Sequence, residues 1–130
     1  MIGYIPSGTA GIARIESLKC SENESKKPIF VLTARVESPY SYRGLTLTKV
    51  VPLHAVDAVT EWDQLERLVY LLKLIDPTAM DVNEPYISDA MLSIEKSRPL
   101  VGFRIYGLDG IQLGKRQIIE ITGRADYVNV

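Results

Sequence analysis

The sequence predicts a mainly β domain in which three strands precede a helical segment and two strands follow it. Short segments in the first and last parts of the chain alternate apolar and polar residues, which is the period of a strand. Between residues 60 and 98 the apolar residues recur instead at helical spacing. The 130 residues contain no repeat or linker, so we expect one domain with a single core.

The first strand is expected over residues 9–19, after an N-terminal arm at residues 1–8. Its alternation is imperfect, because Ile12 and Ile15 fall on opposite faces of a regular strand. A bulge near Gly11 would bring both side chains to one face, and bulges are common where strands curl. We therefore expect a bulge in this strand.

The second and third strands are expected on either side of a short polar loop. Residues 20–27 are polar and indicate an exposed hairpin loop before the second strand, which is expected over residues 29–37. This strand has one apolar and one mixed face, as in an antiparallel sheet with one side open to solvent or ligand. The third strand is expected over residues 43–53, and Lys49 interrupts its apolar series.

The helical segment begins where Thr60 can act as an N-cap, with Asp63 near the first-turn amides. Asp76 and Pro77 end this first helix. A second, shorter helix is expected over residues 88–97. The apolar stripe of the first helix predicts a well-buried face and consists of Leu65, Leu68, Val69, Leu72 and Ile75, widened by Leu71 and Leu74.

The last two strands are expected over residues 100–106 and 116–122. The dipeptide at residues 109–110 is Asp-Gly and indicates a turn between them. The glycines of this region, Gly107, Gly110 and Gly114, lack the lysine-serine ending and the following helix of a phosphate-binding loop, so we expect them to serve turns.

Five short strands with a helix between the third and the fourth is the order of an OB-fold, a small and partly open Greek-key barrel. The second and third strands of such barrels, with their loops, commonly bind oligonucleotides or sugars. We therefore expect residues 1–130 to form one five-stranded OB-fold-like barrel with a helical insertion at residues 60–98. Such a small barrel leaves edge strands, so a homo-oligomer is also expected.

From residue 8 to residue 128 the chain also resembles phage-type single-stranded-DNA-binding proteins. The matching features are a glycine-led first strand (Gly11-Ile12-Ala13-Arg14-Ile15), a Tyr-x-Gly turn (Tyr42-Arg43-Gly44) before Leu45-Thr46-Leu47, a leucine-rich helix, and the strand Val101-Gly102-Phe103-Arg104-Ile105. The resemblance implies sequence-independent binding that protects unpaired DNA during replication or recombination. The chain departs from it at residues 126–130, which carry one acid where many single-strand binders have a flexible acidic tail.

The candidate site combines a loop with one face of the sheet. Aromatic rings beside cations are what an unpaired nucleic acid needs, because the rings stack bases and the cations meet phosphates. Two interpretations stay open: Arg35 and Arg104 either contact a ligand or pair with acids such as Glu37 and Glu120 on a solvated face. Lys49 either reaches a phosphate from the barrel mouth or protects an edge strand. The predicted nucleic-acid-binding residues are Arg35, Tyr40, Tyr42, Arg43, Lys49, Arg104 and Tyr106.

Composition narrows the function classes. The net charge of −1 counts against a strong nonspecific duplex binder. Cys20 is the only cysteine, so neither an intrachain disulfide nor a cysteine metal cluster can form, which fits a reducing compartment. The chain shows no secretory signal at its start and no apolar run long enough to span a bilayer. We therefore expect a cytoplasmic protein without membrane contact.

Catalysis is not expected. His54 is the only histidine and lacks a partner for metal or acid–base chemistry. Asp76, Asp81 and Glu84 do not match a calcium loop and are expected to be solvated loop acids. Trp62 is expected to pack over a barrel end, because its large apolar area is costly to leave in water. We predict no enzyme activity, cofactor or metal, and the alternative function is a protein-interaction or assembly module on the same barrel.

Overall fold

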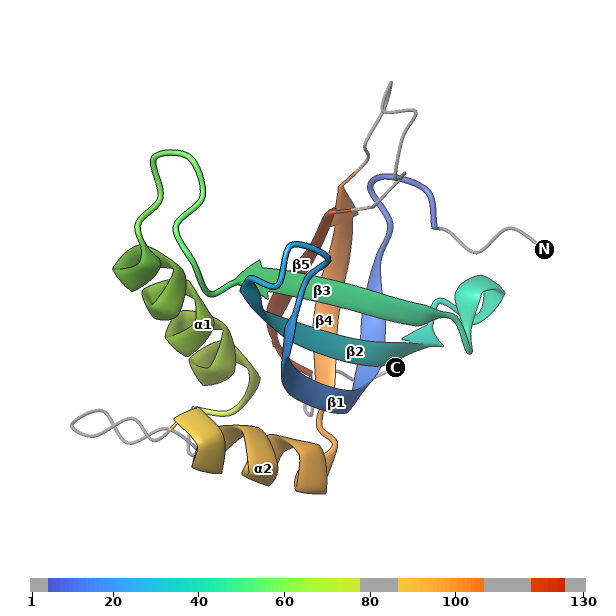
Figure 1. The fold of residues 1–130 in the computed structure, drawn as a ribbon. Helices are drawn as coiled ribbons and strands as arrows, with labels where there is room; N and C mark the ends of the chain where they lie inside the picture. Colours follow the sequence, from blue (N-terminus) through green and yellow to red (C-terminus); the bar gives the residue numbers. More distant parts are fainter. Residues whose placement is uncertain (1–4, 78–86, 107–117, 126–130) are drawn as a thin grey trace.

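The computed structural model describes residues 5–77, 87–106 and 118–125. Its main feature is a five-stranded antiparallel sheet with the strand order β3-β2-β1-β4-β5 (Figure 1). The strands are β1 (Ala10–Glu22), β2 (Pro28–Ser38), β3 (Thr46–Pro52), β4 (Leu100–Tyr106) and β5 (Ile118–Arg124). Two helices, α1 (Glu61–Ile75) and α2 (Ile87–Ser97), lie between β3 and β4 in the sequence. The predicted mainly β class with a helical segment after the third strand is confirmed.

The two helices lie together at one end of the sheet (Figure 1). Helix α1 contacts β3 and β5, whereas α2 contacts β1. The predicted N-cap is confirmed, because Thr60 Oγ1 accepts a hydrogen bond from the Asp63 backbone N–H at 3.1 Å. This bond satisfies one of the amides that a helix leaves unpaired at its start.

The hydrophobic core lies between the inner face of the curled sheet and the two helices. Phe30 and Leu32 of β2 are fully buried, as the alternation of that strand predicts. The first helix buries Leu68, Leu71, Leu72 and Ile75, and the second buries Ala90 and Ile94. Ile5 is also buried in this core, so the described end of the N-terminal arm packs against the domain.

The register of β1 with β2 shifts at two places. Between Ile12 and Ala13 the extra residue is Glu37 of β2, and between Ile15 and Ser17 it is Glu16 of β1. The bulge of β1 therefore lies at Glu16 and not near Gly11 as predicted, and Ala13, Ile15 and Leu18 are the β1 residues in the core cluster. A Cβ atom on Gly11 would lie 2.0 Å from the backbone oxygen of Ser38. The irregular start of β1 thus depends on a residue without a side chain.

The open edges of the sheet, β3 and β5, face each other across a seam. Successive antiparallel pairings make these two strands run in the same direction. No backbone ladder joins them among the described strands, but Lys49 Nζ on β3 donates a hydrogen bond to the Ile119 backbone oxygen on β5 at 2.8 Å. The sheet therefore curls far enough for a side chain to bridge its two edges.

The predicted start of the hairpin loop, at residue 20, is wrong. Strand β1 continues through Cys20 to Glu22, where its side chains are exposed on both faces. The turn begins at Asn23, whose Oδ1 accepts hydrogen bonds from the backbone N–H groups of Ser25 and Lys27 at 2.9 Å each. The hairpin extends past the core into solvent, so its polar composition did not indicate strand.

Two further boundaries differ from the prediction. β3 begins at Thr46 rather than residue 43, because Tyr40–Tyr42 form a short 3-10 helix (η1) and Gly44 has a φ of 92°. Such a positive φ favours glycine and interrupts a strand. At the other end of the chain β5 runs to Arg124 instead of residue 122.

Candidate functional site

The predicted cations of β2 and the β2–β3 loop gather on the outer face of the sheet, the face turned away from the core. Arg35 of β2 lies opposite Arg14 of β1 in the strand register and opposite Thr46 of β3. Arg43 follows η1 and lies 3.9 Å from Glu37 through its Nη2 atom. We call Arg14, Arg35 and Arg43 the arginine patch.

Each guanidinium of the arginine patch lies beside a carboxylate. Arg14 Nε is 3.4 Å from Glu37 Oε1, and Arg35 Nε is 3.3 Å from Glu16 Oε1. All three arginines remain exposed. Exposed ion pairs of this kind contribute only about 0–1 kcal/mol, so the acids mainly lower the local positive potential. Arg14 is held more firmly, because its Nη1 also donates to the Arg98 backbone oxygen at 2.8 Å.

The two tyrosines of the loop have different surroundings. The Tyr40 side chain is 84% exposed, so its ring is free to stack against a ligand. Tyr42 is half-buried and packs against the hydrophobic core. Tyr40 and Arg43 belong to the same turn, in which Arg43 N donates to Tyr40 O at 3.1 Å, and Arg35 lies five residues before Tyr40 on β2. Tyr42 packs against the core below this turn.

Arg104 and Tyr106 form a second group on the outer face, together with Glu120. Arg104 lies opposite Glu120 in the β4–β5 register, and the Tyr106 hydroxyl donates a hydrogen bond to Glu120 Oε2. That hydrogen bond is the main reason why the pKa of Tyr106 is raised, with smaller contributions from burial and from the Glu120 charge, against an opposing effect of Arg104.

The arginine patch and the Arg104–Tyr106–Glu120 group do not form one flat surface. Strand β1 separates β2 from β4, and β4 and β5 cross the direction of β2 and β3 steeply (Figure 1). A ligand that contacts both groups must therefore follow the curvature of the sheet around β1.

Lys49 lies away from the outer face, at the mouth of a cleft in the seam between β3 and β5. This seam cleft has a volume of about 890 Å³ and is closed on its third side by α1. Burial lowers the pKa of Lys49, and the nearby charge of Glu120 partly opposes this effect. Neither role predicted for Lys49, reaching a phosphate from the barrel mouth or protecting an edge strand, includes its hydrogen bond to β5.

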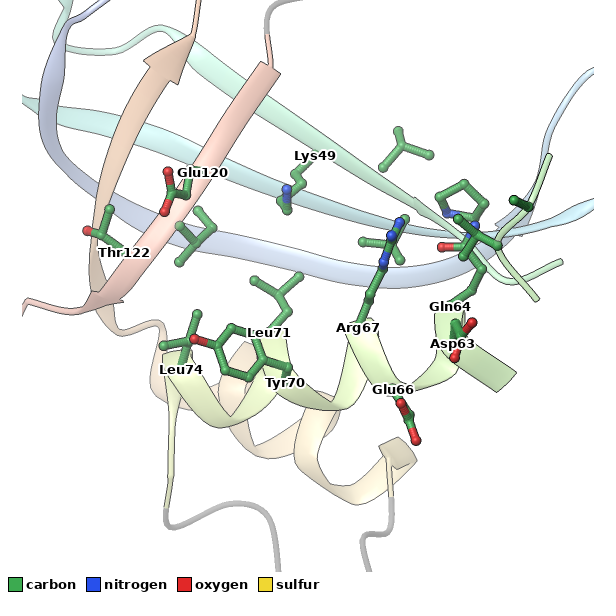
Figure 2. A pocket seen from close by; sticks show the side chains of 16 residues that line it. Lys49, Asp63, Gln64, Glu66, Arg67, Tyr70, Leu71, Leu74, Glu120 and Thr122 are labelled. Atoms are coloured by element: carbon green, nitrogen blue, oxygen red, sulfur yellow. The ribbon is translucent and has the colours of Figure 1, made fainter. Parts of the chain in front are cut away.

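Helix α1 presents polar side chains to the same cleft. In Figure 2, Arg67 extends from the helix toward the strands, whereas Glu66 points away from them. Gln64 also lines the cleft and is only 2% exposed. These residues were not predicted as functional. The signal was present, because Gln64 occupies a buried helical stripe with Leu68, Leu71 and Ile75 in which a polar residue is unexpected.

Two interpretations of single residues are wrong. Trp62 does not pack over a barrel end: its side chain is 68% exposed, and its indole Nε1 donates a hydrogen bond to Glu66 Oε1 at 2.7 Å. Asp76 is not a solvated acid, because it is buried and lies 3.3 Å from Arg124 Nη1 of β5. The predictions for Asp81, Glu84, residues 107–117 and residues 126–130 concern parts of the chain outside the described residues.

The remaining chemistry-bearing side chains of the described residues lie apart from one another. Cys20 is exposed, and His54 Nδ1 lies 3.1 Å from the Ala55 backbone oxygen. Within residues 5–77, 87–106 and 118–125, no group of three or more histidine, cysteine, aspartate or glutamate side chains could hold a metal ion. No helix in the described ranges is long and apolar enough to cross a membrane.

In comparisons with known proteins, no family model and no curated protein matches this chain.

Proposed function

We propose that this chain is an OB-fold protein that binds single-stranded DNA without sequence preference and protects it during replication or recombination. The strand order supports the fold assignment, because bringing β3 against β5 converts β3-β2-β1-β4-β5 into the closed order of an OB-fold barrel. The Lys49 hydrogen bond to Ile119 already spans those two strands. The pair of helices is a longer insertion than the minimal fold contains.

The observation that carries the proposal is the position of Tyr40, Arg35 and Arg43. All three are exposed on the second strand and on the loop that leads to the third, the region that OB-folds commonly use for oligonucleotides. An exposed aromatic ring beside cations is the combination that holds an unpaired strand. Backbone phosphates would take the place of Glu16 and Glu37 beside the arginines, and bases would stack on Tyr40.

The rest of the predicted set extends this track. Arg104 and Tyr106 would meet the strand where it passes around β1, and Tyr42 would keep the loop in position through its contact with the core. Lys49 lies apart from the track, in the seam cleft. Because binding by cations releases counterions from the DNA, affinity should fall steeply as salt rises.

The test is fluorescence anisotropy with labelled oligo-dT at low and moderate salt. Tyr40→Ala should weaken binding by about 1–3 kcal/mol, the value of one stacked base. Arg35→Gln combined with Arg43→Gln should weaken it further and reduce the slope of log affinity against log salt by about two, one for each phosphate contact. Lys27→Gln is the control, since it removes one exposed cation at the other end of β2 from Arg35. Equal loss in the control, or no binding at low salt, rejects the proposal.

A second candidate function is a protein-interaction or assembly module. It is favoured by the pairing of every arginine of the patch with an acid, because a surface of mixed charge suits a protein partner better than a polyanion. Light scattering after size-exclusion chromatography would measure self-association. A stable oligomer that leaves Tyr40 buried and oligo-dT unbound would select this function over DNA binding.

A further inference from the structure

The seam cleft has the size and walls of a ligand site. Its volume of about 890 Å³ lies in the range of small-molecule pockets, about 300–1,000 Å³. Val51 of β3, Ile121 of β5 and Leu71 of α1 provide apolar walls, and the polar groups project between them. A few polar groups set in an apolar cleft are the usual composition of a site that orients a small ligand.

Two cations, Lys49 and Arg67, line this cleft together with three acids, Asp63, Glu66 and Glu120. Among the described residues, the Arg67 guanidinium has no ion pair or hydrogen bond. The Lys49 ammonium uses one of its donors on Ile119. Two of the three acids accept a hydrogen bond from a neutral neighbour, Glu66 from the Trp62 indole and Glu120 from the Tyr106 hydroxyl. Both keep their negative charge, and that of Glu120 acts on Lys49. The third, Asp63, lies at the first turn of α1.

Gln64 adds a hydrogen-bond acceptor without a donor. Its side chain is buried, and no described residue donates to Oε1. A buried acceptor without a hydrogen-bond donor is unfavourable, so the presence of the Gln64 side chain in this cleft calls for an explanation. Gln64 and Arg67 are three residues apart on α1, about 4.5 Å of axial rise. One ligand can therefore reach both groups.

We propose that the seam cleft binds one nucleotide, with its phosphate between Lys49 and Arg67 and its base donating an N–H group to Gln64 Oε1. A phosphate monoester carries between one and two negative charges at neutral pH, which suits a cleft lined by two cations better than the charge of a single carboxylate does. The base packs flat against the apolar walls. Every nucleobase carries at least one N–H donor, so the site distinguishes a nucleotide from a bare anion.

The cleft site is separate from the track on the outer face. Its cations and its acceptor lie in the seam, whereas Tyr40, Arg35 and Arg43 lie over β2 and its loop. The nucleotide can be free or can be the 5′-phosphorylated end of a strand, since both present the same phosphate and base. The two sources differ only at the 3′-oxygen, which is a free hydroxyl in the nucleotide and is esterified in the strand.

Isothermal titration calorimetry with dAMP, deoxyribose 5-phosphate and inorganic phosphate tests the site. We expect dAMP to bind at least tenfold more tightly than deoxyribose 5-phosphate, which has no base. Arg67→Gln should weaken dAMP at least tenfold. Gln64→Met should lower the affinity for dAMP to about the affinity that the wild type has for deoxyribose 5-phosphate. It should leave the affinity for deoxyribose 5-phosphate unchanged and should not lower the melting temperature of the protein.

The controls separate this site from the proposed DNA track. Lys96→Gln should leave dAMP affinity unchanged, and Tyr40→Ala should weaken oligo-dT but not dAMP. Comparing dT oligomers with and without a 5′-phosphate tells a strand end from a free nucleotide, and tighter binding of either one than of phosphate supports the site. Equal affinity for dAMP and inorganic phosphate overturns the proposal. It is also overturned if a short peptide with a free carboxylate binds at Arg67 with higher affinity than dAMP does.

Discussion

At the scale of single residues, Lys49 shows how position changes the role of a side chain. In a regular edge strand its ammonium would lie in water, but the curl of the sheet brings β5 within reach, and the ammonium donates to Ile119. The charged form loses hydration in the seam, and this lowers its pKa below the ordinary 10.5. The charge is therefore less favourable in the folded chain than in the unfolded chain.

The lowered pKa of Lys49 predicts that the stability of the fold depends on pH. Between the lowered pKa of the folded chain and the ordinary 10.5, Lys49 holds more protons in the unfolded chain than in the folded one. Because the unfolded chain binds more protons, the free energy of unfolding of the wild type increases as pH rises through this window. Lys49→Met removes the contribution. The melting temperature of the wild type minus that of Lys49→Met, followed by circular dichroism from neutral to alkaline pH, should increase. A difference that stays flat or falls contradicts the assignment.

At the scale of elements, Gly11 is the position on which the start of β1 depends. A methyl group there would meet the Ser38 backbone oxygen at 2.0 Å and Pro39 Cδ at 2.8 Å. A backbone oxygen and a proline ring cannot move aside as a flexible side chain does. The close approach of β1 to the end of β2 therefore requires glycine.

We predict that Gly11→Ala destabilises the fold by about 1–3 kcal/mol, the usual cost of forcing extra volume into a packed region. Thr48→Ala on the exposed face of β3 is the control, because it shortens a surface side chain without a clash. Urea denaturation of the three proteins measures the difference. If Gly11→Ala and Thr48→Ala are equally stable, the close packing of β1 on Ser38 does not hold in solution.

Most elements could be predicted because their signals are local. The alternation over β2 and β4 and the helical stripe of α1 depend only on neighbouring residues. The end of β1 could not be predicted in this way, because Cys20–Glu22 form strand pairs in solvent, where no apolar face marks them. Trp62 was misplaced for a related reason: its helical position alone did not show which side of α1 faces the core.

At the scale of the whole molecule, the candidate site could be predicted only in part. The exposure of Arg35 and Tyr40 follows from strand phase and loop composition. Their ion-pair partners do not, since Arg35 pairs with Glu16, which is 19 residues away and is itself the bulged residue of β1. The seam cleft depends on the curl of the entire sheet and on the docking of α1, which no local pattern specifies.

The seam also predicts where backbone amides exchange fastest within the sheet. Leu53 N donates to Pro28 O, and antiparallel pairing alternates bonded and non-bonded pairs, so the Val51 amide faces β2 and the Val50 amide faces the seam. In native-state hydrogen exchange the Val50 amide should exchange much faster than that of Val51. Comparable protection of both would mean that β3 and β5 form a closed ladder in solution.

Four antiparallel ladders hold the five strands together, whereas the Lys49–Ile119 contact is one side-chain hydrogen bond. Pulling apart any two laddered strands would rupture a row of bonds, but spreading β3 from β5 would cost that single bond plus some contact with α1. The domain is therefore mechanically soft in one direction and stiff in the others. Under load, β3 and β5 should therefore separate first while the remainder of the sheet keeps its shape.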